Sequence, residues 1–178
     1  AALALAWAGA LGGDMVGLYS FDSRPRLFVP PGPGRAMFPR LRALTAAMHY
    51  STVETNHTLA MMHLHGKLKR RSLVVVFSDF VDSTSAELLV ENLGVLARHH
   101  VMLYVALRDP MLDATARPTE MTLNSIAKSV SATQILNERN LVIDRLSRLG
   151  VICLDVPPQN LTPALVSRYI DIKSRELV

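Results

Sequence analysis

The chain has 178 residues, of which 49% are hydrophobic and 19% charged, so it can bury one sizeable core and is not disordered as a whole. Nineteen Lys and Arg against 15 Asp and Glu give a net charge of +4, which alone is weak support for nucleic-acid binding. The single cysteine, Cys153, excludes an internal disulfide framework, and no apolar run reaches the roughly 18 residues that a membrane-spanning helix needs.

Apolar segments of strand length alternate along the chain with longer segments of helical spacing. In the first part of the chain the pattern predicts a helix over 1–12, a strand over 14–21, a short antiparallel edge strand over 26–29 and a loop over 30–34, followed by helices over 35–48 and 57–71. In the second part it predicts strands over 73–77, 101–107 and 151–156. A helix over 84–98, a helical region over 119–149 that is broken once and a closing helix from 162 complete this part. The stretch 30–34 is expected to be a loop because its prolines lack amide donors. Residues 73–77 (LVVVF) are typical of a central parallel strand that is covered on both faces.

This alternation predicts an α/β fold with a doubly wound, mostly parallel sheet, one short antiparallel edge strand and helices on both faces, a three-layer sandwich of the Rossmann type. In such sheets ligands bind in the crevice at the carboxyl ends of the strands. The residues expected at this edge follow the predicted strands and are Ser78, Asp79, Asp82, Arg108, Asp109 and Asp155.

Several segments together resemble a known family. They are GDMVGLYSFDSRPRLFVPPGPGR, RRSLVVVFSDFVD, LRDP and GVICLDVPPQNLTPALVSRYIDIKSR, and their order and spacing are similar to those of the bacterial family called domain of unknown function fifty-eight, which looks like a von Willebrand factor A domain. The resemblance implies one domain over residues 1–178. It also implies that the domain is incomplete at its N-terminus, because the first strand and its Asp-x-Ser-x-Ser loop are not found in the chain.

Von Willebrand A domains carry a metal-ion-dependent adhesion site, and the resemblance implies which residues would form it here. Thr55, in Glu54-Thr55-Asn56, matches the threonine ligand of the second loop, and Asp79, in Ser78-Asp79-Phe80, matches the aspartate of the third loop. The resemblance implies Mg²⁺ as the cofactor, since Mg²⁺ prefers hard oxygen ligands and retains water. The site is incomplete in this chain, because the first loop is missing.

The resemblance implies a non-enzymatic domain that binds a protein partner at a rim formed by Ser78, Asp82, Arg108 and Asp109. The partner it implies is a MoxR-type AAA+ ATPase, in a chaperone-like role. No small-molecule substrate is expected. Members of the resembling family are commonly anchored in the membrane by preceding segments, so the domain is expected to face the cytoplasm.

Three alternatives stay open. The same fold can serve as a metal-free interaction scaffold, or as a phosphatase-like hydrolase that uses Asp79. Nucleic acid could bind through four cations at the end of the helix over 57–71, namely Lys67, Lys69, Arg70 and Arg71. Favourable interaction with the helix C-terminal dipole explains these charges more simply. A zinc site at His57, His63 and His65 is not favoured, because His63 and His65 point in different directions on a helix.

Overall fold

The computed structural model describes all residues except 50, 79–82, 119 and 121, and its chain is divided into two compact units. Unit 1 comprises residues 1–72 and 161–178, and unit 2 comprises residues 73–160. Each unit has its own sheet and its own helices, so the two are described separately.

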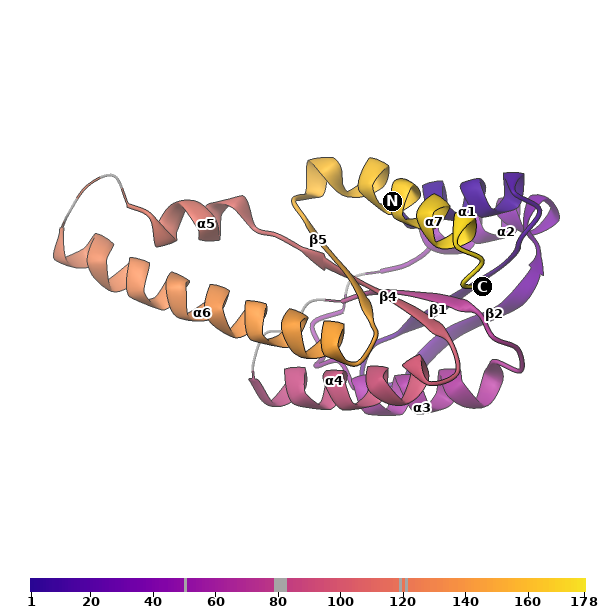
Figure 1. Ribbon diagram of the computed structural model, residues 1–178, viewed down its shortest axis with the longest axis horizontal. Helices are drawn as coiled ribbons and strands as arrows, with labels where there is room; N and C mark the ends of the chain where they lie inside the picture. The colour runs from indigo at the N-terminus through magenta and orange to yellow at the C-terminus, as the bar shows by residue number, and fades with distance from the viewer. Residues whose placement is uncertain (50, 79–82, 119, 121) are drawn as a thin grey trace. The chain divides into compact units, whose positions relative to one another are not determined.

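Unit 1 is built on a β-hairpin that is covered on both faces by helices (Figure 1). Its elements are α1 (Ala2–Leu11), β1 (Met15–Phe21), β2 (Pro25–Pro33), α2 (Gly34–Ala46), α3 (His57–Lys67) and α7 (Leu161–Ser174). β1 and β2 are antiparallel, with Leu18 opposite Val29. In Figure 1, α1, α2 and α7 lie on one side of this hairpin and α3 on the other. The fully buried Val29 and Leu165 are part of the core of this unit.

The prediction of a loop at 30–34 is wrong, because β2 continues through Pro30, Pro31 and Gly32 to Pro33. Val16 pairs with Gly32 and Met15 with Pro33. Among the described strands β2 pairs with β1 alone, and the register of this pair shifts between Val16 and Leu18, opposite the prolines. Strands accept proline at the edge of a sheet and at such irregularities. The predicted short strand at 26–29 is therefore the first part of a longer one.

Unit 2 contains a parallel sheet with the strand order β3-β4-β5. Its elements are β3 (Leu73–Phe77), α4 (Ser83–Ala97), β4 (Val101–Leu107), α5 (Pro110–Ala116), α6 (Leu123–Arg148) and β5 (Ile152–Val156), followed by a short 3₁₀ turn, Pro158–Asn160. β4 is the central strand, and each of its residues from 102 to 106 is at most 1% exposed. Leu89 and Leu93 of α4 and Leu146 of α6 have no exposed surface and complete this core.

Two details of unit 2 differ from prediction. Among the described strands β3 pairs with β4 alone, so the central position expected for LVVVF belongs to β4. The predicted helical region over 119–149 is one unbroken helix, α6, and a separate helix, α5, precedes it. α5 and α6 run antiparallel and extend beyond the strands of unit 2 (Figure 1). Gly150, at φ +81°, follows α6 in the left-handed conformation that commonly ends a helix.

The described strands and helices confirm the predicted α/β class, with a parallel sheet and a short antiparallel pair of strands. None of the helices in the described residues is both long enough and apolar enough to cross a lipid bilayer.

Candidate functional site

The predicted ligand Thr55 lies in the segment that joins α2 to α3, close to the carboxyl end of β1. The amide of the next residue, Asn56, donates a hydrogen bond of 2.9 Å to the carbonyl oxygen of Asp22, the residue that follows β1. The Asn56 side chain then caps α3 by accepting from the amide of Leu59 at 2.9 Å. Thr55 is exposed, and its hydroxyl has no hydrogen-bond partner among the described residues. Thr55 therefore lies in a loop of unit 1, as the sequence predicts, and its role as a metal ligand stays a prediction.

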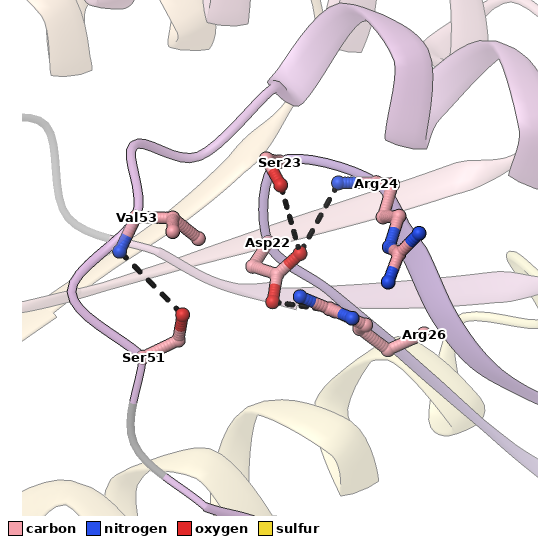
Figure 2. A network of polar contacts seen from close by, with 6 residues as sticks. All are labelled: Asp22, Ser23, Arg24, Arg26, Ser51 and Val53. Carbon is pink, nitrogen blue, oxygen red and sulfur yellow. Dashed lines mark hydrogen bonds and ion pairs between the residues drawn. The ribbon is translucent and has the colours of Figure 1, made fainter.

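The carboxylate of Asp22, the residue whose carbonyl binds Asn56, is already engaged in hydrogen bonds (Figure 2). It accepts hydrogen bonds from the side chain of Arg26 at 2.6 Å, from the amide of Arg24 at 3.2 Å and from the hydroxyl of Ser23. Desolvation alone would raise the pKa of Asp22, but the hydrogen bonds from Arg26 and Arg24 outweigh it and lower the pKa. Asp22 therefore organises the turn between β1 and β2.

The second predicted ligand, Asp79, and the rim residue Asp82 lie outside the described residues. The convergence of Thr55 and Asp79 on one cation therefore stays a prediction. Ser78, the residue immediately before this gap, follows β3, and its carbonyl oxygen accepts a hydrogen bond of 2.9 Å from the hydroxyl of Tyr104. Tyr104 belongs to the central strand β4, so this bond ties the end of β3 to its neighbour.

The predicted rim residue Arg108 belongs to a charged cluster at the carboxyl ends of β4 and β5. Its guanidinium donates to one carboxylate oxygen of Asp155 at 3.0 Å, and Arg139 of α6 donates to the other at 2.8 Å. Desolvation alone would raise the pKa of Asp155, but the hydrogen bonds from Arg139 and then Arg108 reverse this and lower it. Arg139 is 8% exposed, so this ion pair is largely buried. The role of Arg139 was not expected from the sequence, where it is one cation of a long helix.

The predicted rim residue Asp109 is a helix cap. Its carboxylate accepts a hydrogen bond of 2.8 Å from the amide of Met111, and Pro110 occupies the first turn of α5. An aspartate followed by a proline at the first helical position is a signal for a helix start. That signal could have revealed α5, and it assigns Asp109 a structural role.

Two histidines of α3 lie in an aromatic cluster in unit 1. His57 packs edge-on against Phe21, and His63 stacks on Tyr19 at a ring distance of 5.6 Å. The Nδ1 atoms of both rings are buried without a hydrogen-bond partner among the described residues. His57 is only 7% exposed, and burial lowers its pKa below the ordinary value of 6.5 because the charged ring would lose hydration.

This burial predicts a pH-dependent stability. Below about pH 6.5 the unfolded chain protonates His57 to a greater extent than the folded chain does, because the pKa of His57 is lower in the folded chain, so the free energy of unfolding falls as the pH falls. We expect His57→Phe to remove roughly 1 kcal/mol of the loss between about pH 7.5 and about pH 5.5. Urea denaturation at the two pH values measures it, with the exposed His49→Phe as control. A pH dependence that is unchanged in His57→Phe would contradict this assignment.

A second cluster that the sequence did not reveal connects the two ends of unit 1. The carboxylate of Asp14, just before β1, accepts hydrogen bonds from the hydroxyl of Tyr169 and from the ammonium group of Lys173, both on α7. Burial and the adjacent carboxylate raise the pKa of Tyr169, so its hydroxyl stays protonated and donates. Asp14 lies 155 positions from Tyr169 and 159 from Lys173 in sequence, which explains why no local pattern indicates this cluster.

Within the described part of the chain, no three His, Cys, Asp or Glu side chains come together as a metal-binding group. Cys153, on β5, is half-buried, and burial raises the pKa of its thiol, as is typical of an unreactive cysteine.

Comparison with known proteins identifies a family. The family described as "Protein of unknown function DUF58" matches residues 1–125, from α1 to the first turn of α6. Comparisons with curated proteins and with solved structures find no significant match. Since the family match covers well over half of the chain, the chain belongs to the DUF58 family.

Proposed function

We propose that the chain is a non-enzymatic interaction domain that binds a protein partner at the carboxyl ends of its strands, through a Mg²⁺ ion held in part by Thr55. The observation that carries this proposal is the position of Thr55. Its hydroxyl is exposed and without a partner among the described residues, while the adjoining Asn56 is tied to the end of β1. A hydroxyl held in this way can serve an external ligand, because no internal hydrogen bond has to be broken first.

The chemistry of the proposed site is that of a hard cation. Mg²⁺ takes six oxygen ligands and readily keeps water, so the Thr55 hydroxyl and the Asp79 carboxylate would leave positions for water and for an acidic side chain of the partner. Asp22 is a poor substitute for Asp79, since Arg26 already neutralises its carboxylate.

In this proposal the predicted rim residues do not bind Mg²⁺ themselves. Arg108 is paired with Asp155, and Asp109 caps α5, so both maintain the edge of the sheet in unit 2. Ser78 and Asp82 flank the proposed ligand Asp79 in the sequence. The family resemblance implies a MoxR-type AAA+ ATPase as the partner, and this partner is the first to test.

The proposed magnesium site is tested by calorimetric titration of MgCl₂ into three chains: the unmodified chain and two variants. We expect the unmodified chain and Ser51→Ala to release or absorb heat on binding, and Thr55→Ala to bind Mg²⁺ at least about tenfold more weakly, as expected when one ligand is lost. Ser51 is the matched control, because it is an exposed hydroxyl of the same segment, and it accepts a hydrogen bond from the amide of Val53 (Figure 2). The absence of Mg²⁺ binding in all three chains would contradict the metal site.

The partner is tested with a purified MoxR-type ATPase in Mg²⁺ and in EDTA. We expect binding that EDTA and Thr55→Ala both weaken. Binding that is equal in EDTA would support the metal-free scaffold and contradict the bridging ion. Hydrolysis of p-nitrophenyl phosphate that Asp79→Asn abolishes would contradict the non-enzymatic function.

A further inference from the structure

Charge is divided very unevenly between the two units. Unit 1 contains twelve Lys and Arg residues and five Asp and Glu residues, which gives a net charge of +7. Unit 2 contains seven Lys and Arg residues and ten Asp and Glu residues, which gives a net charge of −3. Between residues 23 and 72 there are nine Lys and Arg, and Glu54 is the only acidic residue. The modest net charge of the whole chain therefore conceals one strongly basic unit.

The acidic residues of unit 1 neutralise few of these cations. Asp22 pairs with Arg26, Asp14 with Lys173, and Asp171 with Arg168 and Arg175. By contrast, four exposed cations at the end of α3 form no ion pair with any described residue. These four, called the basic cluster below, are Lys67, Lys69, Arg70 and Arg71.

The helix dipole accounts for only part of this cluster. α3 ends at Lys67, and Leu68, which caps it, is already in an extended conformation. Lys69, Arg70 and Arg71 therefore lie beyond the last turn, where the attraction of the dipole falls off. These charges raise the electrostatic self-repulsion of unit 1 without a compensating internal contact, which is the arrangement expected of a surface that meets a polyanion.

α3, the helix that leads into the basic cluster, also carries two exposed apolar side chains. α3 buries Ala60, Met61 and Leu64 against unit 1. On the opposite side, Leu59 is 44% exposed and Met62 is 67% exposed. Because residues three apart share one side of a helix, these two side chains lie together on the surface.

We propose that the basic cluster and the exposed pair Leu59 and Met62 form a docking surface for an anionic lipid membrane. The four cations would lie among the lipid phosphates and carboxylates, while the two apolar side chains would enter the boundary between headgroups and acyl chains. A nucleic-acid backbone would satisfy the cations equally well, but it offers nothing apolar to cover Leu59 and Met62. The combination of charge and apolar surface therefore favours lipid. This surface is separate from the Thr55 site and does not depend on the proposed function.

The charge requirement is tested by sedimentation of the chain with vesicles. One set is pure phosphatidylcholine, and the other contains about one-third phosphatidylserine. We expect binding to the anionic set alone, and a loss on the order of 1,000-fold when all four residues of the basic cluster are changed to Gln, since each cation contributes about 1 kcal/mol. A matched variant changes to Gln four exposed cations of unit 2 that form no ion pair with a described residue, and it should bind as the unmodified chain does; these are Arg98, Arg117, Lys128 and Arg148. Equal losses in the two variants, or equal binding to both vesicle sets, would overturn the proposal.

The apolar requirement separates lipid from nucleic acid. Met62→Ser should weaken vesicle binding about threefold to tenfold, since the side chain would no longer contribute buried apolar area. Met111→Ser, on the similarly exposed Met111 of α5, should leave it unchanged. Binding of a DNA duplex by a chain that does not bind the anionic vesicles, with no effect of Met62→Ser, would overturn the lipid assignment. Mg²⁺ titration of the basic-cluster variant tests the Thr55 site independently, so failure of one proposal does not affect the other.

Discussion

Arg139→Met is expected to destabilise the chain by about 3 kcal/mol, because it removes one partner of a buried ion pair and leaves Asp155 with incomplete compensation. The Arg139 side chain is 10% exposed and that of Asp155 16%, so water cannot fully replace the lost guanidinium. Arg108 still pairs with the other carboxylate oxygen, which is why the expected loss lies at the low end for a buried pair. Urea denaturation monitored by circular dichroism measures the change.

Arg108→Met is the matched control for this ion pair. Arg108 binds the same carboxylate, but its side chain is 48% exposed, so we expect a loss of no more than about 1 kcal/mol. The double change Arg139→Met with Asp155→Leu should recover part of the stability, since it removes both buried charges together. Equal losses for Arg139→Met and Arg108→Met would show that burial does not determine the strength of this cluster.

Leu146→Ala should destabilise the chain by about 3 kcal/mol, because it opens a cavity in the core of unit 2. Leu146 lies in the last two turns of α6 and has no exposed surface. Leu141→Ala, on the same helix, is the control: Leu141 is 59% exposed, so its loss should stay within about 0.5 kcal/mol. Both variants are compared by their denaturation midpoints. A large loss for Leu141→Ala would mean that a neighbour covers this residue in solution.

Much of the fold is predictable from local patterns, since spacing and turn residues act over a few positions. The apolar run at 101–107 predicts a buried strand, and it forms the central strand β4. The run at 73–77 predicts a strand covered on both faces, and β3 forms there, but β4 is its single described neighbour. The pattern of apolar and polar residues along a strand indicates which faces of that strand are covered by other parts of the protein. It does not report how many strands lie beside a given one.

The prolines of β2 show a second limit of sequence-based prediction. A strand accepts proline at the edge of a sheet or at a shift of register, and both features of β2 depend on its pairing with β1. The stretch 30–33 could therefore be assigned to a strand only after the position of β2 at the edge of its sheet was known.

For the residues of the candidate site, positions along the chain were predictable from the sequence but contacts were not. Their order along the chain places Ser78, Arg108 and Asp109 directly after strands, and the structure confirms these positions. Their contacts were not predictable, because Arg108 pairs with a residue 47 positions away and Asp155 also binds Arg139 on α6. Thr55 was found through the family resemblance, and its closeness to the end of β1 depends on one backbone hydrogen bond to Asp22.

The sequence alone determined the α/β class, the position of most helices and strands, the family resemblance and the basic character of residues 23–72, because each follows from short-range patterns or from composition. Only the tertiary structure decided which polar side chains are engaged and which remain exposed. Arg139 and Asp155 are paired and largely buried, whereas Thr55 and the basic cluster are exposed without a partner among the described residues. The physical reason is that burial and hydrogen bonding join residues far apart in the chain, and their free energies depend on contacts that no local pattern contains.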